Sequence, residues 1–198
     1  MYAILAEDPS DLKVLAILIR RIAKDDSIRI TGKGYQGAPE MLKQGAKQLK
    51  VYQANEKIQR YVICYDSDGK NAEARRQELI SKIVKPANIK HPVCALVPIQ
   101  EIEAWIMADM KAVKKVITSW DYGKDIPRPE MIESPKEHLE KLSRQNQNQK
   151  PRYSHAMHNE KIAVHLDLES VKHKCPSFSP LVTLVNEGVG NVETSAIQ

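Results

Sequence analysis

Aromatic residues and cysteines are scarce in this chain of 198 residues. It has a single phenylalanine, and its three cysteines (Cys64, Cys94 and Cys175) are an odd number with no C-x-x-C spacing. That pattern argues against a disulfide framework and against a cysteine zinc site, so we expect reduced thiols in a cytoplasmic protein. The chain also lacks a long hydrophobic run and a basic segment at its N-terminus. We therefore expect no membrane span and no signal peptide.

Acidic residues are outnumbered by basic ones. The chain has 30 lysines and arginines against 25 aspartates and glutamates, which gives a formal net charge of +5. A basic balance of this kind favours a polyanionic partner such as nucleic acid, DNA or RNA, without establishing one. The hydrophobic content of 42% is enough for one well-buried domain.

Short apolar segments alternate with longer helical patterns in the first part of the chain. We expect strands at 2–6, 28–31, 61–65 and 91–98, and helices at 12–23, 39–52, 72–84 and 102–116. This alternation predicts an α/β fold with a parallel sheet flanked by helices. Two more helices are expected at 133–143 and 155–168, on either side of the polar tract SRQNQNQK. The predicted organisation is an α/β domain at 1–118, a helical extension packed on it at 119–185 and a flexible tail at 186–198.

Acidic residues follow three of the four expected strands. Glu7 closes the first strand, Asp66 and Asp68 follow the third in the segment YDSDG, and Glu101 and Glu103 come after the fourth. Ligands of parallel sheets gather at the carboxyl ends of the strands, and residues two apart in an extended backbone face the same way. We therefore expect these carboxylates on one edge of the sheet. Oxygen ligands in that number suit Mg²⁺ or Mn²⁺, so we prefer a metal site to a plain Asp-Gly turn.

A glutamate after the first strand and Asp-x-Asp after the third resemble the Toprim domain. The segments AEDPSD, ICYDSDG, QEIEAWIMAD and KCPSF together resemble a family of small stand-alone Toprim proteins of unknown function. That family is related to the nucleases named for the overcoming-lysogenization-defect (OLD) protein and is often linked to phage defence. The resemblance extends from Tyr2 to about Leu184 and implies a Toprim-like (Rossmann-like) sheet with a C-terminal helical extension.

The resemblance also implies roles for the acids. Glu7, Asp66, Asp68 and Glu103 correspond to catalytic residues, and these four with Glu101 correspond to metal ligands. The implied activity is metal-dependent hydrolysis of phosphodiester bonds in nucleic acid, with an ATPase or another defence-system protein as partner. The chain departs from the family at Asp8, where a glycine usually follows the first glutamate. The extra carboxylate keeps open a non-catalytic role as a nucleic-acid-binding or regulatory partner.

Basic residues near the proposed site are candidates for contact with phosphate groups. Lys43, Lys47 and Lys50 have the spacing of one helix face, and a second group follows the Asp-x-Asp segment. The predicted nucleic-acid-binding residues are Lys43, Lys47, Lys50, Lys70, Arg75 and Arg76.

Three further patterns admit other interpretations. Gly32, Gly34 and Gly37 match G-x-G-x-x-G, but we prefer a flexible loop over the site to a dinucleotide site. The strand with Asp-x-Asp-Gly also resembles haloacid-dehalogenase phosphatases, in which Asp66 would be the nucleophile and Asp68 the acid. His155 and His158 share a helix face without clear zinc partners; one histidine could serve as a proton shuttle.

Overall fold

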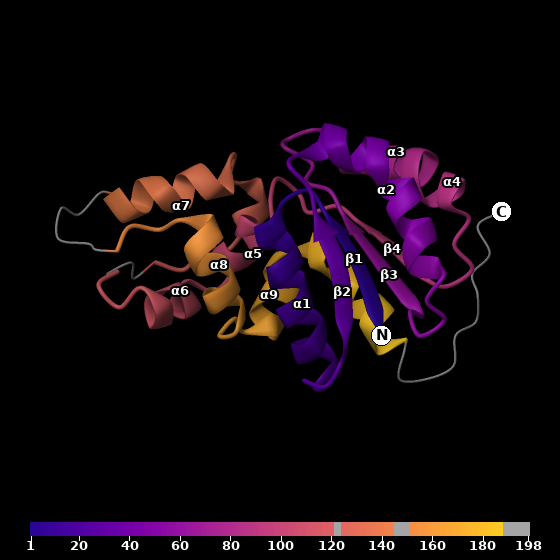
Figure 1. The fold of residues 1–198 in the computed structure, drawn as a ribbon. Coiled ribbons are helices and arrows are strands. Elements are labelled where there is room, and N and C mark those ends of the chain that lie inside the picture. The colour runs from indigo at the N-terminus through magenta and orange to yellow at the C-terminus, as the bar shows by residue number, and fades with distance from the viewer. Residues whose placement is uncertain (121–123, 145–150, 188–198) are drawn as a thin grey trace.

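The computed structural model describes residues 1–120, 124–144 and 151–187. Its centre is a four-stranded sheet in the order β2-β1-β3-β4, and every neighbouring pair is parallel (Figure 1). The strands are β1 (Tyr2–Ala6), β2 (Ile30–Gly34), β3 (Arg60–Cys64) and β4 (Val93–Leu96). The predicted α/β fold with a parallel sheet and flanking helices is confirmed.

The strands end level with one another. Ala6 at the end of β1 pairs with Gly34 on one side and with Cys64 on the other, and Cys64 pairs with Leu96. Because the strands are parallel and in this register, the residues that follow them leave the sheet at one edge. The register of the strands therefore brings together acids that are about a hundred residues apart in the chain.

Helices cover both faces of the sheet. One face carries α1 and α10, with α5 beside them in the same hydrophobic cluster, and the other carries α2, α3, a π-helical turn and α4 (Figure 1). Ile4 of β1 is buried among the first group and Leu5 among the second, because alternate residues of a strand point to opposite faces. These elements are α1 (Pro9–Ala23), α2 (Ala38–Gln53), α3 (Ala72–Leu79), the π-helical turn (Ile80–Val84), α4 (Lys85–Ala87), α5 (Glu103–Met107) and α10 (Ser179–Asn186).

The C-terminal helices lie beyond one side of the sheet, at the left of Figure 1. They share one hydrophobic cluster with the sheet, in which the rings of Trp105 and Phe178 meet edge to face at 5.1 Å. The elements are α6 (Met110–Val116), α7 (Pro135–Arg144), α8 (His155–Ala163) and α9 (Leu168–Lys174), with 3-10 turns at Pro129–Met131 and Pro176–Phe178. Over the described residues, no helix has the length and apolarity to cross a membrane.

Strand β2 differs from its predicted position. It begins at Ile30 and ends at Gly34, so Gly32 and Gly34 lie in the strand and do not form a flexible loop. A Cβ on Gly34 would lie 2.4 Å from the Cα of Pro9, and one on Gly32 would lie 2.7 Å from the carbonyl oxygen of Ile4. The glycines are therefore explained by the close approach of β2 to β1 and to the start of α1.

Two predicted helices are each divided. The segment 102–116 forms α5 and α6, because the Asp109 carboxylate accepts hydrogen bonds from the Lys111 and Ala112 N–H groups and caps a new helix. The segment 155–168 ends as a helix at Ala163, and Asp167 caps α9. The tract 145–150 and most of the predicted tail, 188–198, lie outside the described residues.

Candidate functional site

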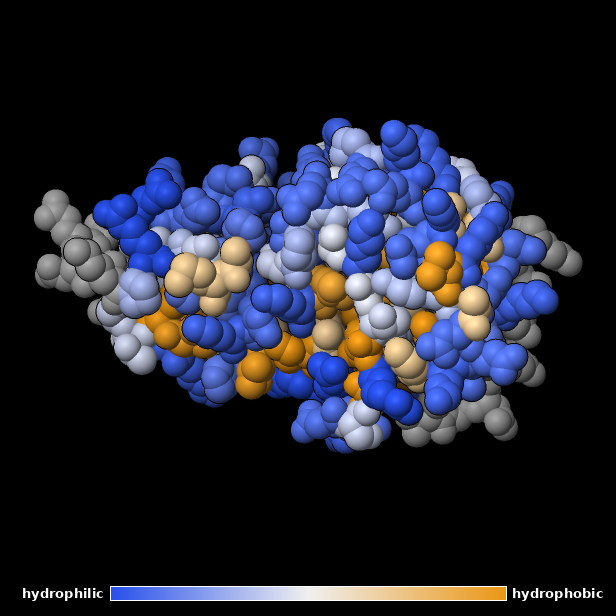
Figure 2. All heavy atoms as spheres, viewed as in Figure 1, coloured by the Kyte–Doolittle hydropathy of each residue, from blue (hydrophilic) through white to orange (hydrophobic). Residues whose placement is uncertain are grey.

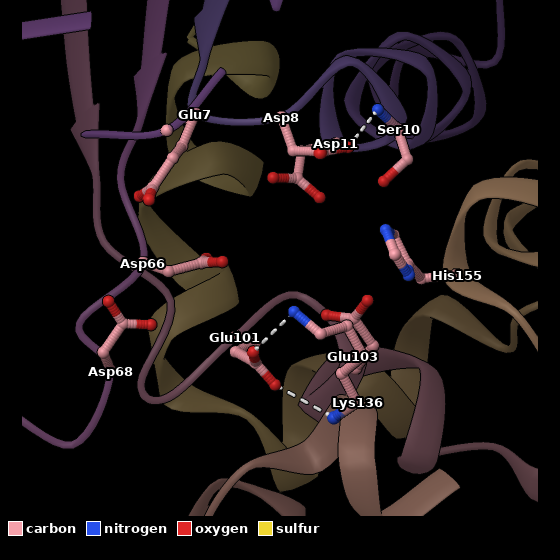
Figure 3. Close-up of a pocket in the computed structure, with 11 residues that line it drawn as sticks. Glu7, Asp8, Ser10, Asp11, Asp66, Asp68, Glu101, Glu103, Lys136 and His155 are labelled. Carbon is pink, nitrogen blue, oxygen red and sulfur yellow. Dashed lines mark hydrogen bonds and ion pairs between the residues drawn. The ribbon is translucent and has the colours of Figure 1, made fainter. Parts of the chain in front are cut away.

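A polar pocket of about 160 Å³ lies at the carboxyl edge of the sheet (Figure 3). All five carboxylates predicted from the sequence line it, and two further acids from the start of α1 join them. The lining residues are Glu7, Asp8, Ser10, Asp11, Gly37, Asp66, Asp68, Glu101, Glu103, Lys136 and His155. The pocket therefore concentrates negative charge in a chain that is basic as a whole.

Glu7 is held at the start of α2. The backbone N–H of Ala38 donates to Glu7 Oε1 at 3.1 Å, and the Gly37 N–H donates to the Glu7 carbonyl oxygen at 3.1 Å. Glu7 Oε2 is buried and has no hydrogen-bond partner among the described residues. Burial, followed by the nearby charge of Asp68, raises the pKa of Glu7.

Asp66 and Asp68 lie on a loop that is fixed to the chain after β4. The buried Ser67 accepts a hydrogen bond from the Gln100 N–H at 2.9 Å, and the Asp68 N–H donates to the Gln100 carbonyl at 3.2 Å. Strand β3 ends at Cys64, and Asp68 is left-handed with φ of 50°. Both carboxylates line the pocket, as predicted. They are placed there by a loop, however, and not by the extended backbone that we expected from the sequence.

Asp66 is surrounded by other acidic residues. Its Oδ1 atom is buried without a hydrogen-bond partner among the described residues. Burial, then the charges of Asp11 and Glu103, raise the pKa of Asp66 well above its usual range. This carboxyl group therefore keeps its proton to a higher pH than an ordinary aspartate does.

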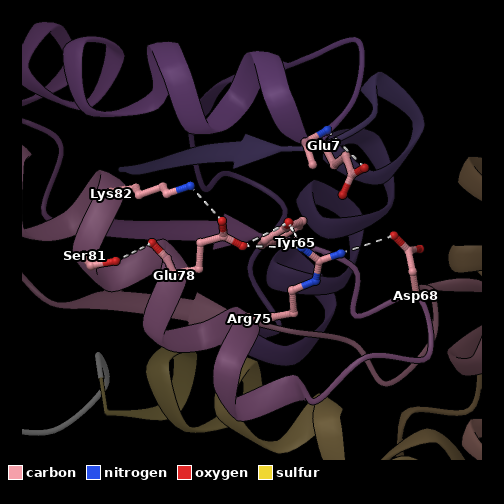
Figure 4. A network of polar contacts seen from close by, with 8 residues as sticks. Glu7, Tyr65, Asp68, Arg75, Glu78, Ser81 and Lys82 are labelled. Carbon is pink, nitrogen blue, oxygen red and sulfur yellow. Dashed lines mark hydrogen bonds and ion pairs between the residues drawn. The ribbon is translucent and has the colours of Figure 1, made fainter.

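Arg75 belongs to a polar network beside Asp68 (Figure 4). Its guanidinium lies 3.9 Å from Asp68 Oδ2, stacks 4.5 Å from the centre of the Tyr65 ring and donates to the Tyr65 hydroxyl. It also lies 3.4 Å from Glu78 Oε2, while Lys82 lies 2.9 Å from the other oxygen of Glu78. The side chain of Arg75 is only 14% exposed, so its main contacts are internal.

Glu101 and Glu103 are each held by a C-terminal helix. At the start of α7, the Lys136 N–H donates to Glu101 Oε2 at 2.9 Å, and Lys136 Nζ lies 3.3 Å from Oε1. From α8, Asn159 Nδ2 donates to Glu103 Oε1 at 3.0 Å, and Asn159 Oδ1 accepts from the Tyr153 hydroxyl. Burial and the charge of Glu101 raise the pKa of Glu103 to about 7, against the effect of the Asn159 hydrogen bond.

Asp11 is a site residue that the sequence analysis missed. It is 6% exposed, and burial, Glu103 and Asp8 raise its pKa well above the usual range. The sequence indicates the burial of Asp11 only through its spacing. Asp11 lies four residues before Leu15 and therefore on the buried face of α1. Lys136 and Asn159 were also missed, because contacts across more than thirty residues leave no local pattern.

Asp8 caps α1. Its Oδ1 atom accepts from the Ser10 N–H at 2.6 Å, which is a role that a glycine side chain cannot fill. Asp8 therefore has a structural role at the start of α1, and its carboxylate also lines the pocket.

The pocket offers the oxygen atoms that a hard cation binds, but these side chains do not point to one common position. Within the described ranges, no three His, Cys, Asp or Glu side chains are placed so as to hold one metal ion as they stand. The donors are carboxylate oxygens, however, and Glu7 and Asp66 each present a buried oxygen without a partner. These residues fit Mg²⁺ or Mn²⁺ if their side chains turn toward a common point.

The predicted basic residues differ in their distance from the pocket. Lys43, Lys47 and Lys50 are exposed on α2. The upper right of the surface in Figure 2 is largely hydrophilic. Helix α2 begins at the pocket, but Lys50 lies about 18 Å further along it at 1.5 Å per residue. Lys70 and Arg76 are exposed near the Asp68 loop, where Arg76 lies 3.6 Å from Glu73.

The two histidines on α8 have different surroundings. His155 lines the pocket. His158 is buried, its Nδ1 atom lies 3.0 Å from the Ser154 nitrogen, and its ring stacks with Tyr153. They do not act as a pair toward one ligand.

The chain belongs to a protein family. The family model described as Domain of unknown function (DUF4276) matches residues 6–186. Neither the curated proteins nor the solved structures gave a significant match to the chain.

Proposed function

We propose that this member of the DUF4276 family is a nuclease that uses Mg²⁺ or Mn²⁺ to hydrolyse phosphodiester bonds. The observation that carries the proposal is the pocket itself, in which seven carboxylates surround about 160 Å³ and two buried oxygens lack partners. Like charges at this density are unstable unless protons or a cation neutralise them. A divalent cation does so at neutral pH.

The residues divide into ligands and supports. Glu7, Asp11 and Asp66 line the pocket and would hold the ion together with Asp68 or Glu103. When bound, such an ion polarises a phosphate and lowers the pKa of a water molecule. Arg75 orients Asp68, Asn159 orients Glu103, and Lys136 neutralises Glu101.

Two observations support nucleic acid as the substrate. The chain has a net charge of +5 although its pocket is acidic, and exposed cations lie on α2 and beside the Asp68 loop. Phosphate contacts of this kind position a strand without reading its sequence. The resemblance to OLD-type Toprim nucleases agrees with this chemistry, and it is the basis for proposing an ATPase or another defence-system protein as partner.

The test combines metal binding with cleavage. We expect Mg²⁺ or Mn²⁺ to raise the melting temperature of the wild type and to support cleavage of labelled DNA or RNA, and EDTA to abolish both effects. Asp66→Asn should lose the thermal shift and lower the cleavage rate by roughly a hundredfold or more, since it removes a ligand charge. Glu56→Gln, at an exposed acid outside the pocket, is the matched control.

Other results would point elsewhere. An equal metal-induced shift in Asp66→Asn and in the wild type would overturn the site. Hydrolysis of a small phosphomonoester but not of oligonucleotides, with loss in Asp66→Asn, would favour the haloacid-dehalogenase type of phosphatase. Metal binding without any hydrolysis would favour a non-catalytic role.

A further inference from the structure

We propose that Ser10 and His155 form a second subsite in the acidic pocket, that it binds a sugar hydroxyl, and that the substrate is therefore RNA. This inference rests on the proposed function, which brings a phosphodiester into the same pocket. It concerns the wall of the pocket opposite to Glu7, Asp66 and Asp68 (Figure 3).

Helix packing brings the two residues to one wall. Ser10 lies in the first turn of α1, His155 is the first residue of α8, and these two helices pack against each other. At the surface, Lys13 and Glu160 join the same helices by an ion pair of 3.4 Å. The Ser10 and His155 side chains lie on the same side of the pocket in Figure 3.

Both side chains have a buried polar atom without a partner. Ser10 is 8% exposed, and neither Ser10 Oγ nor His155 Nδ1 has a hydrogen-bond partner among the described residues. Buried polar groups are nearly always paired, so these two atoms indicate a ligand that is bound during function. His158 gives the contrast, since its Nδ1 atom is satisfied locally by Ser154.

The surroundings select the kind of ligand. A hydroxyl and an imidazole can each donate or accept a hydrogen bond, whereas the neighbouring carboxylates of Asp8 and Asp11 only accept when ionised. A phosphate oxygen only accepts, so it cannot pair with Asp8 in addition to Ser10 or His155. A sugar hydroxyl can donate to a carboxylate and accept from Ser10 or His155. The hydroxyl that lies next to a phosphodiester in RNA, and is absent from DNA, is the ribose 2′-OH.

The test compares oligonucleotides of one sequence made as RNA, DNA and 2′-O-methyl RNA. Cleavage rates are measured in Mg²⁺, and affinities are measured by fluorescence anisotropy with Ca²⁺ in its place. We expect the wild type to prefer RNA over both analogues by roughly tenfold, as expected for one or two uncharged hydrogen bonds. Ser10→Ala and His155→Phe should each lower the ratio of RNA to DNA. Ser27→Ala and His165→Phe, at exposed positions, should preserve it.

Equal rates and equal affinities of the wild type for RNA and DNA would overturn the inference. So would an unchanged ratio in both variants that still fold, as judged by their melting temperatures. If neither nucleic acid is cleaved but RNA binds more tightly through Ser10 and His155, the proposed nuclease activity fails and the hydroxyl subsite stands.

Discussion

Replacing Glu103 with glutamine should stabilise the metal-free protein at pH 8 and change its stability little near pH 4. Glu103 is 4% exposed, and its pKa is raised from 4.5 to about 7. At about 1.4 kcal/mol per pKa unit, keeping this group ionised in the folded state costs about 3 kcal/mol. Glutamine removes the charge and keeps the oxygen that accepts from Asn159 Nδ2.

The pH window follows from the two pKa values. Below pH 4.5 the carboxyl group is protonated in both the folded and the unfolded state. It therefore carries no charge and does not lower the stability of the fold. Between pH 4.5 and about 7 the folded state holds a proton that the unfolded state has released, so stability falls as the pH rises. Above that range the full cost applies, and the variant should have its largest advantage.

Urea unfolding in EDTA at pH 4 and pH 8 measures the effect, with Glu56→Gln as the control. A gain of about 3 kcal/mol corresponds to roughly 6–12 °C in melting temperature for a chain of this size. Addition of Mg²⁺ should then favour the wild type, because the variant has lost one of the proposed anionic ligands. A loss of stability at pH 8, or an equal gain at both pH values, would refute the assignment of charge strain to Glu103.

Three other substitutions test the supports of the pocket. Gly34→Ala should lower the free energy of unfolding by about 1–3 kcal/mol, because the new Cβ would meet the Pro9 backbone at 2.4 Å and displace the turn that carries Asp8. Urea unfolding measures the loss of stability, and the Mg²⁺-induced thermal shift measures the effect on the pocket. Arg75→Met should lower the cleavage rate by roughly tenfold, because Asp68 loses a charged neighbour at 3.9 Å. Lys70→Met removes an exposed cation and should reduce the rate less. Equal effects of the two substitutions would contradict the proposal that Arg75 positions Asp68. Asn159→Leu should lower the free energy of unfolding by about 1–3 kcal/mol, because Glu103 and Tyr153 lose their hydrogen-bond partner in the core. Urea unfolding should show that this loss increases from pH 5 to pH 8, since an ionised Glu103 needs the donor most.

The sheet and the shared position of its acids could be predicted because both depend on short-range rules. Alternating strands and helices imply parallel pairing, and parallel strands in register end at one edge. Glu7, Asp66 and Glu101 each come within a few residues of a strand end, so the topology alone brings them together. Boundaries were less accurate where a single side chain decides them, as at Asp109, which begins a new helix.

The chemistry of individual side chains could not be predicted in the same way. Arg75 was predicted to contact phosphate, but the structure turns it toward Tyr65, Asp68 and Glu78. Asp11 was not among the predicted site residues, because which face of α1 meets the pocket depends on how the helix packs. Both depend on the rotation of a helix about its axis, which hydrophobic spacing fixes only approximately.

The C-terminal helices are part of the site as much as the sheet is. Lys136 of α7 holds Glu101, and Asn159 of α8 holds Glu103, so two acids from the sheet edge depend on residues from 119–185 for their placement. An uncovered sheet edge would leave these carboxylates in water, where their mutual repulsion is weak. Burial raises the pKa values of Asp11, Asp66 and Glu103, and a bound cation would offset the cost of ionising them. The helical extension therefore supplies a buried wall beside the acidic edge, and this burial is one reason for our proposal that the edge binds a divalent cation.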